Sequence, residues 1–341
     1  MFHFLQEFLH CGSIVALSQT RFLLGWGPKI LASQPHPSCV SFYFPDFFLD
    51  NSEPWIFHPN TLEIELNDLE NILNDESVSF QWIQSSEELF RKEFRRTLFL
   101  FQKTSLIKTV PYVFLESDFQ KIPLESMLKS ALNYVSNARA YVYGTWDHEE
   151  GILGATPELL FSKSKGNLLE TMACAGTAKP GMGMLDDRKL MKEHQIVIEG
   201  ISEQLRPLGQ LSTGTTCVVS LPNLAHLVTP MTCSLKNPLS FEKIIESLHP
   251  TPALGAFPKE LGREWLRDYA RLVPRERYGA PAGYLLPNGE CRVYVGIRNV
   301  QWKENRMHLG AGCGIIEESQ EDTEWKEIER KQQSIRQLLG I

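Results

Sequence analysis

Three strand-like segments follow one another closely near the C-terminus, and a helical segment then closes the chain. The three segments are residues 283–286 (GYLL), 292–302 (RVYVGIRNVQW) and 306–314 (RMHLGAGCG). Strand patterns joined by such short connections predict an antiparallel meander. Earlier in the chain, strand and helix patterns interleave without the regular spacing of βαβ units. The sequence therefore predicts a mixed α+β fold rather than a doubly wound parallel sheet.

The rest of the chain divides into short strand patterns and longer helical patterns. The strand patterns, separated by Pro, Gly and Asn, occupy residues 21–26, 39–48, 61–66, 105–116, 140–143 and 159–161. The helical patterns occupy residues 85–102, 124–135 and 186–208. Because the sequence shows no internal repeat, low-complexity tract or obvious linker, we expect a single domain over residues 1–341. Residues 105–341 carry the distinctive motifs of this domain, and residues 1–104 carry few.

Composition and charge exclude several classes of protein. The 341 residues are 43% apolar and 22% charged, which is an ordinary globular composition. The formal net charge of -7 lacks the basic footprint that binding to a nucleic-acid backbone requires. The 7 cysteines are scattered without a CxxC pair, which predicts reduced thiols and a cytoplasmic location. The N-terminal segment has no basic n-region and polar residues break its apolar runs, so neither a signal peptide nor a membrane span is predicted.

The closing helix carries two carboxylates where apolar side chains are expected. On a wheel of about 100° per residue, Glu324 and Glu327 lie on the side that carries Ile328 and the apolar residues of the last turns. Ser319 is expected to cap the N-terminus of this helix. Burying an unpaired carboxylate costs several kcal/mol or forces its protonation, so such a pair usually shares a cation, a base or a proton.

The helix predicted over residues 186–208 has a matching feature. Its apolar stripe carries His194 near the centre and Glu193 at the edge. Glu193, Glu324 and Glu327 could together supply oxygen ligands to one hard cation. Mg²⁺ suits such a site, since it commonly takes one or two carboxylates and leaves room for a substrate anion. Salt bridges at the edge of the core are the alternative explanation of the same pattern.

The chain also contains a series of longer motifs. In order, they are GATPELLF (154–161), AGT (175–177), KEH (192–194), HPTPALGAFP (249–258), RYGAPAGY (277–284), VGIRN (295–299), and GAGCGIIEES followed by EWKE (310–327). Together they resemble the motifs of the chorismate-utilising enzymes, a family that contains isochorismate, salicylate, anthranilate and aminodeoxychorismate synthases. The resemblance runs from residue 106 to the C-terminus, and RFLLGWGP (21–28) is similar to the family's N-terminal strand. It implies two large antiparallel sheets packed face to face with helices outside, with Mg²⁺ and chorismate as ligands.

The same resemblance assigns roles to individual residues. Glu193 and Glu327 are similar to the family's metal carboxylates, and Glu324 to a second carboxylate that reaches the metal directly or through water. The implied substrate-binding residues are Gly176, Thr177, Ala253, Leu254, Tyr278, Arg298, Gly312, Cys313 and Gly314. The assignment is physically coherent, since N–H groups of a glycine turn can approach an anion closely and a guanidinium can hold a carboxylate by two hydrogen bonds.

A few positions indicate which member of the family the chain resembles. Lys108 aligns with the lysine that isochorismate and salicylate synthases use as general base towards water, where anthranilate synthases carry glutamine. Glu158 matches the general acid that protonates the departing C4 hydroxyl. Ala253 and Leu254 resemble isochorismate synthases, and Ala175 stands where aminodeoxychorismate synthases often carry a lysine nucleophile. The predicted function is isochorismate synthase, an isomerase that adds water to C2 of chorismate as the C4 hydroxyl leaves, in menaquinone or siderophore biosynthesis.

Other interpretations of these motifs stay open at this point. A salicylate synthase would go on to eliminate pyruvate from isochorismate. An ammonia-dependent synthase would need a glutaminase partner, which Lys108 argues against, so no glutaminase subunit is expected. A non-catalytic chorismate-binding protein would follow if Val113, which stands where relatives often carry arginine, disabled the site. The sequence is compatible with either a monomer or a homodimer.

Overall fold

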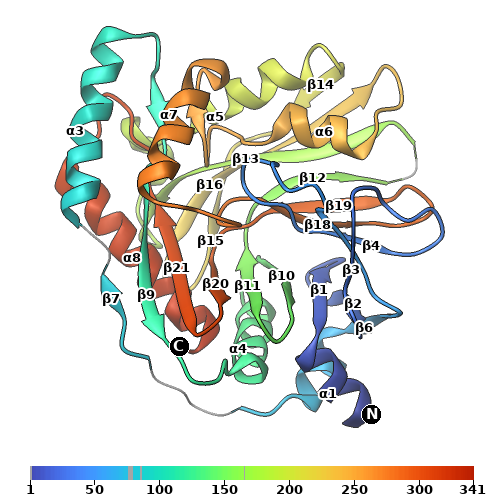
Figure 1. The fold of residues 1–341 in the computed structure, drawn as a ribbon. Helices are drawn as coiled ribbons and strands as arrows, with labels where there is room; N and C mark the ends of the chain where they lie inside the picture. The colour runs from blue at the N-terminus through green and yellow to red at the C-terminus, as the bar shows by residue number, and fades with distance from the viewer. Residues whose placement is uncertain (1, 76–79, 85–86, 165) are drawn as a thin grey trace.

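The computed structural model describes residues 2–75, 80–84, 87–164 and 166–341, and two large antiparallel sheets form its body (Figure 1). The first sheet has nine strands. In spatial order they are β6 (Asn60–Glu65), β2 (Arg21–Trp26), β1 (Gly12–Ala16), β10 (Tyr141–Trp146), β11 (Glu150–Thr156), β20 (Asn299–Lys303), β21 (Arg306–Gly312), β9 (Tyr112–Asp118) and β7 (Ile83–Gln84). Both ends of the chain contribute to this sheet.

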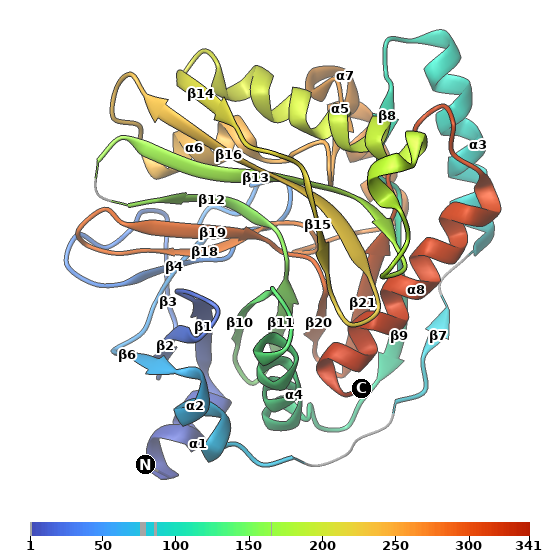
Figure 2. The ribbon, with the colours of Figure 1, turned by 180° about the vertical axis from the view of Figure 1, so that it is seen from behind.

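The second sheet has ten strands. Nine follow one another in space, namely β14 (Gly209–Thr213), β16 (Ala225–Leu235), β13 (Leu168–Ala178), β12 (Leu159–Lys163), β19 (Cys291–Val295), β18 (Pro281–Leu285), β4 (Ser41–Tyr43), β5 (Trp55–Phe57) and β3 (Ile30–Ala32), while β15 (Cys217–Ser220) pairs with β16. The strands of the two sheets run across one another (Figures 1 and 2). A separate pair, β8 (Lys108–Thr109) and β17 (Ala256–Phe257), lies beside them.

The helices lie outside the sheets, as their one-sided apolar patterns require. They are α1 (Phe2–His10), α2 (Leu66–Ile72), α3 (Glu87–Lys103), α4 (Leu124–Ser136), α5 (Arg188–Leu205), α6 (Phe241–Leu248), α7 (Lys259–Leu272) and α8 (Glu321–Leu339), with a short 3-10 turn η1 (Met184–Asp186) before α5. Helices α5, α6 and α7 cover the ten-stranded sheet, and α8 runs along β21 and β9 (Figure 2). Within the described ranges, none of the helices combines the length and apolarity that crossing a membrane requires.

The main core lies between the two sheets. One hydrophobic cluster joins Ile14 and Leu153 of the nine-stranded sheet to Phe42, Tyr284 and Tyr294 of the ten-stranded sheet. A second cluster fills the space between the ten-stranded sheet and the helices α5, α6 and α7. The predicted α+β fold, two large antiparallel sheets packed face to face with outer helices, is confirmed.

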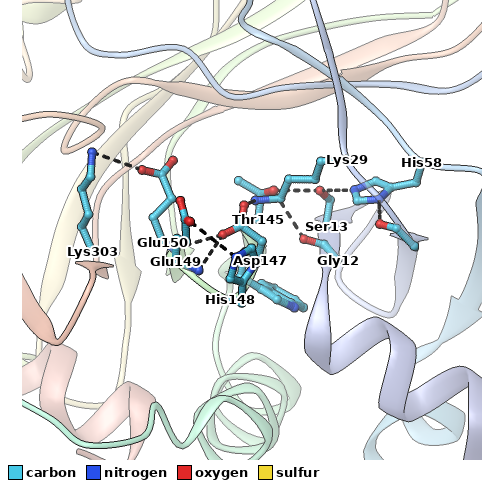
Figure 3. Close-up of polar contacts among 12 residues, drawn as sticks. Gly12, Ser13, Lys29, His58, Thr145, Asp147, His148, Glu149, Glu150 and Lys303 are labelled. Carbon is cyan, nitrogen blue, oxygen red and sulfur yellow. Dashed lines mark hydrogen bonds and ion pairs between the residues drawn. The ribbon is translucent and has the colours of Figure 1, made fainter.

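Polar contacts tie the N-terminal strands to this body, although few motifs were recognised there (Figure 3). Ser13 Oγ of β1 lies 2.8 Å from His58 Nε2 and donates to Thr145 Oγ1 of β10 at 2.9 Å. Lys29 Nζ donates to Asp147 Oδ2 at 2.8 Å. Residues far apart in the sequence are therefore held together where β1 and β10 pair.

Some predicted elements differ from those observed, and backbone chemistry explains the main differences. Residues 292–302 do not form one strand of a meander, because the chain leaves the ten-stranded sheet after β19 and enters the other sheet at β20. The switch occurs at Arg298, whose φ is 57°. A left-handed residue breaks the regular strand conformation, so the chain can change direction there.

Three smaller corrections concern the bounds of elements. Pro111 has no N–H to donate to a strand ladder, and the pattern over 105–116 accordingly splits into β8 and β9. Helix α8 begins at Glu321 with Gln320 as its N-cap residue. Ser319, predicted as the cap, instead accepts a hydrogen bond from the Ile316 N–H at 3.2 Å. Within the strand predicted over residues 39–48, the observed strand is β4, which spans Ser41–Tyr43.

Candidate active site

One pocket collects most of the predicted site residues from distant parts of the chain. Its lining includes Glu158, Gly176, Thr177, Glu193, Ala253, Leu254, Tyr278, Arg298, Gly312 and Gly314. Other lining residues include Val110, Cys174, Ala175, His226, Gly310, Ala311 and Lys331. The pocket therefore lies where strand β13, helices α5 and α8, and the ends of β20 and β21 meet.

Lys108 lies beside this pocket and is buried, with 1% of its surface exposed. Its position is fixed by β8, which pairs with β17 so that Lys108 stands opposite Phe257. Its Nζ donates to Glu193 Oε1 at 3.2 Å. A Cβ built on Gly314 would lie 2.0 Å from that Glu193 oxygen and 2.4 Å from Lys108 Nζ. A side chain at position 314 would therefore displace the ends of the Glu193 and Lys108 side chains.

Glu158 follows β11 and is 2% exposed. Burial raises the pKa of Glu158 to about 8, although nearby cations, Lys108 first among them, oppose the rise. The carboxyl group is therefore mainly protonated at neutral pH. A protonated carboxyl at the wall of a pocket is the state that a general acid must have before it acts.

Arg298 offers an unused donor to the pocket. Its side chain is 6% exposed, and its Nη2 donates to His226 Nε2 at 3.1 Å. Its Nη1 is buried and has no hydrogen-bond partner among the described residues. A buried donor without a partner is costly, and an anion entering the pocket would satisfy it. The geometry favours a carboxylate as the ligand of Arg298.

The contact with Arg298 also defines the protonation state of His226. A guanidinium can only donate, so Nε2 of His226 accepts and the ring proton sits on Nδ1, which lies 3.3 Å from Thr177 Oγ1. Burial, with help from Arg298 and Lys331, holds the pKa of His226 well below its usual range. A neutral His226 thus orients the guanidinium without competing for an anion.

The three predicted metal carboxylates are buried but paired with lysines. Lys189 Nζ lies 3.3 Å from Glu193 Oε2 and 2.8 Å from Glu324 Oε1. Lys331 Nζ lies 2.7 Å from Glu327 Oε1. As the side chains stand, no group of three His, Cys, Asp or Glu residues in the described part of the chain is arranged to hold a metal ion. The metal-binding role of these glutamates stays a prediction.

The same carboxylates nevertheless fit a cation. Glu193 and Glu324 come from different helices and both reach one ammonium, so their oxygens already surround a single positive centre. Burial raises the pKa of Glu324, and the negative charges of Glu327 and Glu193 reinforce the rise. A divalent cation bound among these carboxylates would relieve the repulsion between them, which makes its binding favourable.

Cys313 is the one predicted substrate residue outside the pocket lining. Its side chain is fully buried in a cluster with Phe90 and Trp325, and its N–H donates to the Pro111 carbonyl at 3.2 Å. Val113 packs in the same cluster. The position where relatives often carry arginine therefore lies within apolar packing, and Val113 itself does not line the pocket.

Sequence reasoning missed two lysines that the structure brings to the site. Lys331 follows Glu327 by four residues and donates to the Gly312 carbonyl at 2.7 Å, so it joins α8 to the glycine turn. Lys189 precedes Glu193 by four residues. Residues four apart share a helix face, so the spacing alone could have identified both ion pairs. His226 has no comparable local signal, because β16 brings it to Arg298 from elsewhere in the chain.

Comparison with known proteins decides the family. A family model described as "Chorismate binding enzyme" matches residues 60–340. The chain belongs to this family. Its members, by that description, bind a small molecule, and the match covers all the residues that surround the pocket from Lys108 onward.

Individual relatives of this chorismate-binding enzyme carry more specific names. It is 31% identical over 200 residues to the "Salicylate biosynthesis isochorismate synthase" of Pseudomonas aeruginosa, a match that covers 55% of this chain and 42% of that protein. It is 30% identical over 239 residues to the "Isochorismate synthase MenF" of Bacillus subtilis, a match that covers 64% of this chain and 48% of that protein. The matches thus span about half the length of these relatives.

A solved structure supports the fold independently. The DhbC structure from Bacillus anthracis superposes with a TM-score of 0.82, covers 97% of this chain and 97% of its own, and is 23% identical in sequence. At that identity the likeness shows the fold alone. The arrangement of both sheets and the outer helices is therefore shared with that structure.

Proposed function

We propose that this chorismate-binding enzyme is an isochorismate synthase, which converts chorismate to isochorismate by adding water at C2 while the C4 hydroxyl leaves. The observation that carries the proposal is the pairing of two buried groups at one pocket: Lys108, held by Glu193, and Glu158, with a pKa raised to about 8. Glu158 can donate a proton, and Lys108 can accept one once its ammonium is deprotonated. The names of the relatives point to the same reaction.

Substrate binding would rest on the cations at the pocket. Chorismate carries two carboxylates, and the protein as a whole is acidic, with a formal net charge of -7. Arg298 and Lys331 line the pocket, but Lys331 already pairs with Glu327. Arg298 would therefore supply most of the protein's own attraction for the dianion, and bound Mg²⁺ would add to it. The free Nη1 of Arg298 is suited to one carboxylate, and the glycines on either side of Cys313 let backbone approach closely.

The chemistry then divides between two proton transfers. Lys108 must first lose the proton of the ammonium that pairs with Glu193. Its amine then takes a proton from water as the oxygen attacks C2, and the ring double bonds shift. Glu158 gives its proton to the C4 hydroxyl, which leaves as water. Lys108 ends protonated and Glu158 ionised, so one proton must return through solvent before the next turnover. Each transfer contributes on the order of 10² to 10⁴ in rate.

Mg²⁺ is part of this proposal. Glu193, Glu324 and Glu327 would hold it, and when bound it would supply positive charge that neutralises and orients a substrate carboxylate. The protein's own residues would fix where that charge lies. Glu193 then has two functions, since it also holds Lys108 in place through its Oε1.

Product analysis tests the function directly. The full chain is incubated with chorismate and MgCl₂, and the products are separated by chromatography alongside standards of isochorismate, salicylate and pyruvate. Isochorismate without pyruvate is the expected result. Salicylate with an equal amount of pyruvate would identify a salicylate synthase instead. No product from an enzyme that still binds chorismate would make the chain a non-catalytic binding protein.

A further inference from the structure

Lys189 occupies an unusual position between the two helices that carry the acidic cluster. It lies in the first turn of α5, and its Nζ reaches Glu193 on the same helix and Glu324 on α8, at 3.3 Å and 2.8 Å. Those two glutamates are 8% and 1% exposed at the side chain. One ammonium therefore holds together two buried carboxylates that would otherwise repel each other.

The other two lysines of the cluster are held more firmly than Lys189, one by an additional hydrogen bond and one by nearly complete burial. Lys331 also donates to the Gly312 carbonyl, and Lys108 is almost fully buried against Gly314. Among the described residues, the Lys189 ammonium pairs with Glu193 and Glu324 alone. Its side chain is also the most exposed of the three lysines, at 24% against 15% and 1%. Of these cations, Lys189 is the one that can withdraw towards solvent without breaking other contacts.

We propose that Lys189 is a built-in counter-ion for the acidic cluster, which neutralises Glu193 and Glu324 when Mg²⁺ is absent and is displaced when Mg²⁺ binds. This inference rests on the proposed Mg²⁺ requirement. A lysine stem is flexible and its ammonium is readily solvated, so the exchange needs only a rotamer change. The competition makes Mg²⁺ binding weaker than the carboxylates alone would allow.

The proposal predicts that removing the ammonium strengthens Mg²⁺ binding. Lys189→Met keeps the length of the side chain but not its charge. In calorimetric titrations of the metal-stripped full chain with MgCl₂, without substrate, we expect its Kd for Mg²⁺ to fall at least about tenfold relative to wild type. Lys192→Met is the matched control, because Lys192 lies on the same helix and pairs with Glu318 at the exposed surface. Its Kd should stay within about twofold of wild type.

A second measurement uses the wild-type protein and so does not depend on how a variant folds. Exposed lysines are acetylated with acetic anhydride, with and without MgCl₂, and the modified peptides are quantified by mass spectrometry. Displacement by Mg²⁺ should make Lys189 react several-fold faster when the ion is present, while Lys192 reacts at the same rate in both conditions. Unchanged labelling of Lys189 under saturating Mg²⁺ would overturn the proposal.

The outcomes separate this inference from the function it rests on. If wild type binds Mg²⁺ but Lys189→Met binds it equally or more weakly, the counter-ion role is refuted and the proposed metal site stands. If wild type shows no binding of Mg²⁺ even at millimolar concentration, the metal requirement and the counter-ion role are both refuted. Isochorismate formation is measured separately and is not assumed in either result.

Discussion

Gly314→Ala should disable the enzyme through one local contact. The added Cβ would lie 2.0 Å from Glu193 Oε1 and 2.4 Å from Lys108 Nζ, whereas ordinary contacts of a Cβ begin at about 3.4 Å. The Glu193 carboxylate must therefore move by roughly 1.4 Å, or the turn must shift by a similar amount. Either movement breaks the buried ion pair that holds Lys108.

The expected magnitude follows from this displacement. A misplacement of about 1 Å costs on the order of 100-fold in rate, and overpacking a buried site costs about 1–3 kcal/mol. We therefore expect kcat/KM for chorismate to fall at least about 100-fold, with a lower Tm. Gly183→Ala is the control, because its φ is -72° and the nearest atom to a new Cβ is 3.6 Å away.

Steady-state kinetics with chorismate and thermal denaturation provide the two readouts. A Gly314→Ala enzyme with kcat/KM within about threefold of wild type would show that the glycine is not needed to seat Lys108 against Glu193. The same result would weaken the assignment of Lys108 as the base. A loss of activity shared equally by Gly183→Ala would point to a general effect of substitution rather than to this contact.

Three further predictions address individual groups. Burial raises the pKa of Glu158 to about 8 in the free enzyme, so the acid form is lost as pH rises through 8 and kcat/KM should fall on the alkaline side. A flat profile of kcat/KM up to pH 9.5 (about 1.5 units above that pKa) would contradict this role, and Glu158→Gln should lose about 10² to 10⁴ in kcat. Lys108→Gln should lose a similar factor while near-ultraviolet circular dichroism stays unchanged, and a wild-type rate would remove Lys108 as base. Glu327→Ala should raise the calorimetric Kd for Mg²⁺ at least about tenfold, whereas Glu329→Ala, exposed on the same helix, should not; equal values for both would refute the ligand role of Glu327.

Much of the site could be predicted because it lies on regular helices. The period of an α-helix places Glu324 and Glu327 beside Ile328, and all three are buried in the structure. Glu193 and His194 on α5 are buried for the same reason. Charged residues within an apolar stripe are informative since burial of a charge needs compensation. In the structure lysines compensate them. The pairs four residues apart follow from helix spacing, whereas the contacts of Lys189 with Glu324 and of Lys108 with Glu193 join separate elements and could not be predicted.

The parts that sequence reasoning missed depend on long-range placement. The crossing between the sheets at Arg298 requires a left-handed residue, and a side chain other than glycine gives no local sign of one. Cys313 stands between two glycines, yet the direction of its side chain follows from the pairing of its N–H with Pro111. Such contacts join segments that are distant in sequence, so no local pattern specifies them.

The central claim, that this pocket adds water to chorismate at C2, is tested most directly with isotopic water. The enzyme is incubated with chorismate and MgCl₂ in water enriched in oxygen-18, and the isochorismate formed is analysed by mass spectrometry. Attack by water predicts one solvent oxygen in each product molecule, located at C2. Isochorismate that carries no solvent oxygen would contradict the roles proposed for Lys108 and Glu158, because the hydroxyl group would then have moved within the substrate.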